Sequence, residues 1–308
     1  MGLSEETEEI IGKMDKMVLL EYNGISSFYE LARNIAYNFT SRAKSGNAKN
    51  FSYSPKVLSK YGINTQLKLF VKSENLGKNE YGRFNVVETG DDYGMVLYLN
   101  PNAIRNAAYT EFENNGGNFF QTFYKITLYT CVHELSHMQD NDYDGWYVPR
   151  ATGKGENAME YNYAKAIAYL FIGTEMNSRL SEACSYFYEN PKVIDDLMNQ
   201  SISNNSVSKK VVVNKMIEKA KDLTRIGDMQ SCLCQVRDSN FGDEITSIYK
   251  KWCDKGNGRM AISIEGNDIK ECRQQLIEGM ENKINRFLGY QKTYFKKILE
   301  VFIKKYWS

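Results

Sequence analysis

One short stretch of this chain carries the residue types and the spacing of a catalytic metal site. Residues 130–137 read TCVHELSH and contain the pattern HExxH. Residues four apart lie one turn above each other on an α-helix, so His133 and His137 project from one face and can bind one Zn²⁺. Glu134 projects about 100° away around the helix, where it can hold a metal-bound water rather than the metal itself.

The third ligand must come from elsewhere in the chain. A catalytic zinc takes three protein ligands and keeps one position open for water. The chain has only two histidines, so the third ligand must be Asp, Glu, Cys or Tyr. We favour Glu175, which begins a predicted helix after a loop and one further helix. Glu182, two turns further along nearly the same face, is the alternative. Either could be a solvated glutamate paired with Arg179, and for Glu182 this is the better interpretation.

The HELSH segment is predicted to lie on a helix from Asn118 to about Asp140. This stretch has no Gly or Pro, and its apolar residues recur at helical spacing. Pro101 is predicted to open the preceding helix, because its missing N–H costs nothing in a first turn. Asn, Asn, Gly and Gly at 114–117 interrupt that helix. Three runs upstream have the character of strands separated by turns: Gln66–Lys72, Arg83–Glu88 and Gly94–Leu99.

The remaining segments are predicted to be mostly helical. Residues 5–45 show an apolar stripe with a 3.6-residue period. A polar break at Asn47–Pro55 separates this segment from the strands. The later predicted elements are helices at Met159–Ile172, Glu175–Tyr188 and Asp268–Trp307, and a hairpin at Met260–Glu265. Together these patterns predict an α+β fold.

HELSH followed by a helix bearing Glu175, Ser178 and Arg179 in the pattern Glu-x-x-Ser-Arg resembles the gluzincin group of zinc metallopeptidases, which includes thermolysin. The pair of motifs is similar to that of small phage and bacterial peptidases with Glu-x-x-Ala-Arg. The resemblance covers about residues 65–190. It implies a zincin-like fold, with a small twisted sheet packed on the active-site helix and an edge strand that binds an extended substrate. Gly94–Leu99 would be that edge strand.

The resemblance also implies a mechanism of metal-assisted peptide hydrolysis. His133, His137 and Glu175 would bind one zinc ion, and Glu134 would act as general base. The chain departs from thermolysin at Arg179, where thermolysin has an acidic residue, and it lacks the usual downstream histidine that stabilises the oxyanion. A tyrosine could take that role, and the candidates are Tyr143, Tyr147, Tyr161 and Tyr163.

Charge and composition suggest how the chain is divided. Residues 1–200 carry 19 Lys and Arg against 25 Asp and Glu, whereas residues 201–308 carry 20 against 13. This asymmetry supports a boundary near residue 200. We therefore predict an N-terminal helical segment (1–60), a zincin-like metallopeptidase core (61–200) and a mostly helical C-terminal region (201–308).

Two further groups of residues could bind metals. Asp140, Asp142, Asp144 and Gly145 form the opening of an EF-hand loop, but Ala151 stands where the loop needs Glu. We favour a capped helix end with solvated aspartates over a calcium site. Cys232, Cys234, Cys253 and Cys272 lack the paired spacing of a structural zinc site, so reduced thiols are the preferred interpretation.

The expected partner is a peptide or protein substrate. We expect no nucleic acid, and no insertion into a membrane, because no apolar run approaches the roughly 20 residues that a membrane helix needs. No secretory signal is recognised in Met1–Lys16, which predicts a cytoplasmic protein. The resemblance suggests a bacterial host or phage setting. The alternative function is a non-catalytic adaptor that retains the scaffold and binds a partner through its C-terminal helices; the intact Glu134 argues against it.

Overall fold

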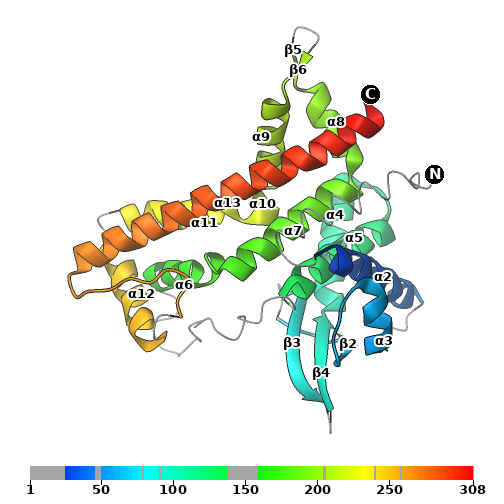
Figure 1. Cartoon of the computed structure of the whole chain (residues 1–308), viewed down its shortest axis with the longest axis horizontal. Coiled ribbons are helices and arrows are strands. Elements are labelled where there is room, and N and C mark those ends of the chain that lie inside the picture. Colours follow the sequence, from blue (N-terminus) through cyan, green and yellow to red (C-terminus); the bar gives the residue numbers. More distant parts are fainter. Residues whose placement is uncertain are drawn as a thin grey trace. The chain divides into compact units, whose positions relative to one another are not determined.

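The chain folds into two compact units that are interleaved in sequence (Figure 1). The first unit comprises residues 1–139, 184–191 and 301–308, and the second comprises residues 140–183 and 192–300. The three parts predicted from the sequence are continuous segments, whereas each of these units combines separate segments of the chain. The computed structural model describes residues 25–45, 50–77, 80–89, 92–137, 159–203, 206–238, 241–256 and 259–307.

A four-stranded mixed sheet forms the centre of the first unit. Its strands, in the order β1-β2-β4-β3, are β1 (Phe51–Tyr53), β2 (Lys68–Ser73), β4 (Asp92–Leu99) and β3 (Gly82–Thr89). β2 and β4 are parallel, whereas the β1–β2 and β3–β4 pairs are antiparallel. The three strands predicted from the sequence are confirmed. β1 was not predicted, because it lies within the segment that was expected to be a polar break.

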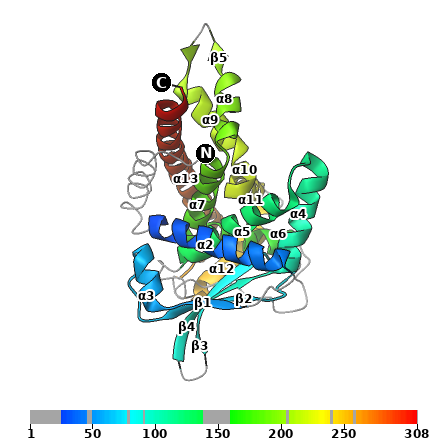
Figure 2. The same ribbon diagram turned by 90° about the vertical axis from the view of Figure 1, so that its right-hand side faces the viewer.

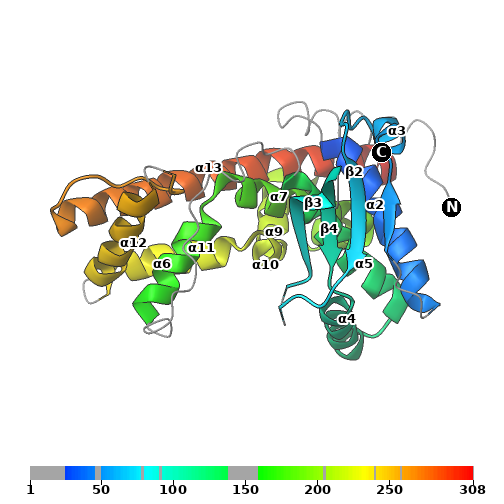
Figure 3. The same ribbon diagram turned by 90° about the horizontal axis from the view of Figure 1, so that it is seen from below.

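The strand order corrects the predicted edge strand. Gly94–Leu99 was expected at the edge, but β4, which contains it, lies between β2 and β3 and pairs with both (Figure 3). β4 is apolar on both faces. Leu97 and Leu99 lie on one face and Val96 lies on the opposite face, and all three are fully buried. Such a run is typical of a central strand. In the described part of the chain, β3 is therefore an edge strand of this sheet, and β1 is the other.

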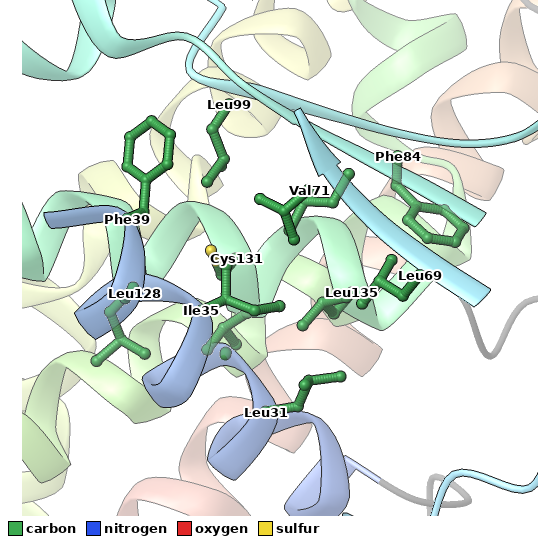
Figure 4. Packing of buried hydrophobic residues seen from close by; sticks show 14 of the residues in the cluster. Leu31, Ile35, Phe39, Leu69, Val71, Phe84, Leu99, Leu128, Cys131 and Leu135 are labelled. Carbon is green, nitrogen blue, oxygen red and sulfur yellow. The ribbon is translucent and has the colours of Figure 1, made fainter. Parts of the chain in front are cut away.

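Two helices cover one face of the sheet. α2 (Ile25–Lys44) and α5 (Phe119–Ser136) lie beside each other over the strands (Figure 2). Because side chains alternate along a strand, every second residue faces the helices. Figure 4 shows the resulting core, to which α2 contributes Leu31, Ile35 and Phe39, α5 contributes Leu128, Cys131 and Leu135, and the sheet contributes Leu69, Val71, Phe84 and Leu99.

Local signals set where α5 begins. α4 (Pro101–Asn115) starts with proline in its first turn, as predicted, and Asn100 caps it. The chain then reverses through Gly116 and Gly117, whose φ values of 67° and 102° belong to the left-handed region that glycine adopts without strain. The Asn118 side chain accepts hydrogen bonds from the N–H groups of the next turn and caps α5. The short α3 (Pro55–Leu58) and the 3-10 turn η1 (Ser59–Tyr61) connect β1 to β2.

The end of α7 (Gly173–Glu189) is tied to α2 and α5 within the first unit. Residues 184–191 belong to this unit. Asn190 donates to the Tyr129 hydroxyl at 3.0 Å and accepts from Lys125 at 2.5 Å. The Tyr29 hydroxyl donates to the Glu189 carboxylate at 2.5 Å. Because α7 is one continuous helix, these contacts fix the end opposite to the one that carries Glu175.

The secondary structure of the second unit, over its described residues, consists of helices and one short hairpin. α12 packs against α6 and α11, and the Tyr161 ring meets the Trp252 ring edge-on at 5.4 Å. Besides the first part of α7, the elements are α6 (Met159–Leu170), α8 (Pro191–Asn199), β5 (Ile202–Ser203), β6 (Ser206–Val207), α9 (Lys209–Lys219), α10 (Lys221–Thr224), α11 (Ile226–Arg237), α12 (Gly242–Gly256) and most of α13 (Ile269–Tyr306). The predicted final helix is confirmed.

The hairpin predicted at Met260–Glu265 is wrong. No strand forms there, although Met260, Ile262 and Ile264 are buried. The Tyr249 hydroxyl accepts from the Ile262 N–H at 3.1 Å, and the Cys253 thiol donates to the Ile262 carbonyl at 3.6 Å. Side chains thus satisfy the backbone groups that a partner strand would otherwise pair, and the apolar residues of this segment fill the helical core.

A buried amide interrupts the apolar stripe of α13 and leads to a stability prediction. Gln291 is fully buried, and within the described part of the chain neither its amide nitrogen nor its oxygen has a hydrogen-bond partner. An unsatisfied buried polar group costs about 1–3 kcal/mol. Gln291→Met keeps the unbranched shape without the amide, so we expect the free energy of unfolding, measured by urea denaturation, to rise by about 1–2 kcal/mol.

The matched control is Gln274→Met on the exposed side of the same helix. It should change the free energy of unfolding by less than about 0.5 kcal/mol. Destabilisation by Gln291→Met would mean that the amide does make hydrogen bonds inside the folded protein.

Candidate metal centre

Helix α5 presents the two histidines side by side. The ring centroids of His133 and His137 are 5.1 Å apart, and the ring planes are inclined at 79°. His133 is half-buried and His137 is 5% exposed. Other residues of the same helical turns, Val132 and Leu135, are buried in the hydrophobic core and hold the helix in place. The predicted arrangement of the pair on one helical face is confirmed.

The last turn of α5 is held by hydrogen bonds to its own backbone. The Ser136 hydroxyl donates to the His133 carbonyl at 2.6 Å. The His137 N–H donates to the carbonyls of Glu134 and Leu135, so His137 itself ends the helix. Ser136 thus satisfies one of the carbonyls left open at a helix C-terminus, and the backbone of both histidines is fixed.

Glu175 lies in the first turn of α7, where an acidic side chain is favourable. The positive end of the helix dipole stabilises a carboxylate at this position. Glu175 is 1% exposed, and its Oε2 is 3.4 Å from Nη2 of Arg179, whose side chain is 13% exposed. The Arg179 guanidinium also lies 5.9 Å from the centre of the Tyr169 ring. The pair with Arg179 that was considered from the sequence is present, but the Glu175 carboxylate is buried rather than solvated.

The structure brings the three predicted ligands together. One ligand atom of each of His133, His137 and Glu175 lies within 4.8 Å of the other two. In a tetrahedral zinc site, ligand atoms about 2.1 Å from the metal are about 3.4 Å from one another. Small rotations of the side chains would reach that spacing. Two imidazole nitrogens and one carboxylate oxygen are a donor set that suits zinc.

Glu134 is close to this group without being part of it. Its side chain is half-buried. The neighbouring Cys131 belongs to the core. Burial, and secondarily the charge of Glu134, raises the pKa of the Cys131 thiol well above its usual range. Cys131 therefore stays protonated and contributes packing rather than a ligand.

Other candidates do not join the centre. Among the described residues, Glu182 and the late cysteines belong to no group of three or more metal-binding side chains. All six cysteines are free, and Cys234 is exposed whereas the other five are buried. Tyr161 and Tyr163 lie on α6, where the Tyr161 ring packs on Trp252. Tyr143, Tyr147 and the aspartates of the calcium-like loop, Asp140, Asp142 and Asp144, lie outside the described residues.

One residue near Glu134 was missed. Gly82 opens β3 and faces α5, with the side chains of Thr130 and Glu134 against it. This strand was predicted to begin at Arg83, and no role was predicted for the glycine. A glycine at the start of a strand can mark a close approach of another segment, and this signal was present in the sequence.

Comparison with known proteins gives no relative from which a function could be transferred. A scan against protein-family models yields no match, and searches of curated proteins and of solved structures find no significant similarity. In the described part of the chain, no helix combines the length and the apolar character needed to cross a bilayer. The function must therefore be argued from the site itself.

Proposed function

We propose that this protein is a zinc-dependent metallopeptidase that hydrolyses peptide bonds. The observation that carries the proposal is the group of His133, His137 and Glu175, whose ligand atoms lie within 4.8 Å of one another. The two histidines belong to an HExxH motif, which also contains Glu134. A structural zinc site has four protein ligands and no use for a general base. Two histidines, one carboxylate and an adjacent Glu134 are the set that a catalytic site needs.

Each residue has a distinct role in this proposal. His133, His137 and Glu175 would hold the zinc, which would supply Lewis-acid chemistry by lowering the pKa of a water and polarising the scissile carbonyl. Glu134 accepts the proton of that water and passes it to the leaving amine. Arg179 pairs with Oε2 of Glu175 through one contact of 3.4 Å and favours the charged form of this carboxylate.

The edge strand β3 supports an extended substrate. Its N-terminal residue, Gly82, lies against Glu134, so a chain that pairs with β3 passes the general base. Backbone hydrogen bonds along an open edge bind a peptide irrespective of its side chains. This position fits the peptide or protein substrate expected from the motif, with β3 in the role that the sequence analysis gave to β4.

Removal and return of the metal tests the proposal. Treatment with a chelator should abolish hydrolysis of a denatured protein substrate, and one equivalent of Zn²⁺ should restore it, because both the water and the carbonyl depend on the ion. Activity would be followed by release of new amino groups. An inhibitor of serine proteases should have no effect. Hydrolysis that persists in metal-free protein would rule out this mechanism, whereas a protein that binds zinc but hydrolyses no peptide would favour the non-catalytic adaptor.

A further inference from the structure

The first residue of the edge strand lies directly on the stem of Glu134. A Cβ atom built on Gly82 would be 2.6 Å from Cγ2 of Thr130, 3.1 Å from Cγ of Glu134 and 3.2 Å from the Tyr98 carbonyl. Real Cβ contacts are essentially never under 3.0 Å. Gly82 is not among the glycines with positive φ, so any L-residue could adopt its backbone conformation. Space alone excludes a side chain here.

Both sides of this contact are rigid. On the strand, Gly82 pairs with Leu99 of β4. Phe84, two residues further on, faces the same side of the sheet as Gly82 and is buried in the core. On the helix, Thr130 and Glu134 are one turn apart and share a face. The Thr130 hydroxyl donates to the Ile126 carbonyl at 2.9 Å, which fixes its rotamer and turns the methyl group toward the strand. Neither segment can withdraw without disturbing the core.

We propose that Gly82 is a positioning residue that sets the location of the Glu134 carboxylate by letting β3 rest against the helix at this point. The inference rests on the proposed peptidase function. The strand backbone confines Cγ of Glu134, which leaves the carboxylate only the rotations about Cβ–Cγ and Cγ–Cδ with which to reach the water. The same strand offers its edge to the substrate. One glycine therefore determines the separation between general base and substrate.

The consequence is that a single methyl group should impair proton transfer without removing the metal. Gly82→Ala must push β3 and α5 apart, or turn Glu134 aside, by several tenths of an ångström. Misplacement of a catalytic group by 1 Å can cost about 100-fold in rate. We expect kcat of Gly82→Ala to fall about 10- to 100-fold, with the zinc content unchanged. Gly77→Ala is the matched control, because its Cβ would meet the Glu80 side chain at 3.4 Å, an ordinary contact.

A double-mutant cycle tests the contact itself. Thr130→Ser removes the methyl group at 2.6 Å and keeps the hydroxyl that bonds to Ile126. The melting temperature and kcat are measured for the wild type, both single variants and the double variant. We expect Gly82→Ala to lower both quantities less in the Thr130→Ser background, since contacting residues couple and distant ones add. The cycle for Gly77→Ala with Thr130→Ser should be additive.

The outcomes separate this inference from the proposed function. Wild-type kcat in Gly82→Ala, or equal losses in both backgrounds, would overturn the positioning role while leaving the peptidase intact. A fall in zinc content equal to the fall in activity would also overturn it, because Gly82 would then act on the metal. A wild type that binds zinc but hydrolyses no peptide would overturn the proposed function, and the role of Gly82 in catalysis with it, whereas coupling in melting temperature would still identify the packing contact.

Discussion

Glu134→Gln should bind zinc as the wild type does and lose about 10²- to 10⁴-fold in kcat. Glutamine has nearly the same shape as glutamate, but its neutral amide cannot accept a proton from water. Glu134 is not among the three clustered ligands, so the metal should remain. The measurements are zinc content by elemental analysis and turnover of a peptide substrate on the same preparation. Loss of turnover at constant zinc is the signature of a missing general base.

Two further variants make this result specific. Glu134→Asp keeps a carboxylate but shortens its stem, so it should fall between the wild type and Glu134→Gln. Glu113→Gln, on the exposed surface of α4, removes a charge far from any proposed ligand and should behave as the wild type. If Glu134→Gln turned over peptides normally, Glu134 would not be the base and the mechanism would have to be abandoned.

Glu175→Ala should lose zinc and activity together. It removes a proposed ligand, and even residues that merely orient a ligand contribute 10- to 100-fold in affinity, so we expect the zinc dissociation constant to rise by more than about 100-fold. The substitution also leaves the guanidinium of Arg179, 13% exposed, without its partner. Breaking a buried ion pair typically costs about 3 kcal/mol, so the melting temperature of the metal-free protein should fall as well. Competition with a fluorescent zinc chelator measures the affinity.

Glu182→Ala is the matched control on the same helix. Glu182 is half-buried and outside the group of clustered ligands, and its removal should leave zinc affinity close to that of the wild type. Glu175→Gln separates the two effects, because it keeps the side-chain volume and a hydrogen-bond acceptor for Arg179 while weakening the metal ligand. The opposite pattern, in which Glu182→Ala loses the metal and Glu175→Ala retains it, would reassign the third ligand.

Much of the local structure could be predicted, because it depends on neighbours in sequence. Pro101, Asn118 and the glycines at 116 and 117 mark helix ends through their own backbone chemistry, and the structure confirms them. The hairpin at Met260–Glu265 failed for the opposite reason. Its alternating apolar residues are buried among helices, and periodicity alone does not say what covers an apolar residue.

The same distinction between local and long-range structure explains which features of the site could be predicted. The geometry of His133 and His137 follows from helical spacing alone, so sequence was sufficient. Strand order is a long-range property, and the sequence therefore misassigned the edge to β4 although each strand was located. The close approach of Gly82 to Thr130 depends on how sheet and helix meet, and no spacing rule predicts it. Glu175 was favoured through a motif, and only the folded chain brings it near the histidines.

The distribution of the cysteines gives a means of checking every variant described above. Five of the six thiols are buried and Cys234 alone is exposed. Burial raises the pKa of the Cys232 thiol to about 12 and also raises that of Cys253, and only thiolates react readily with alkylating reagents. A maleimide added to the native protein therefore attaches once, to α11, whereas the unfolded chain takes up six. Mass spectrometry after brief labelling thus distinguishes a variant that has lost its chemistry from one that has lost its fold.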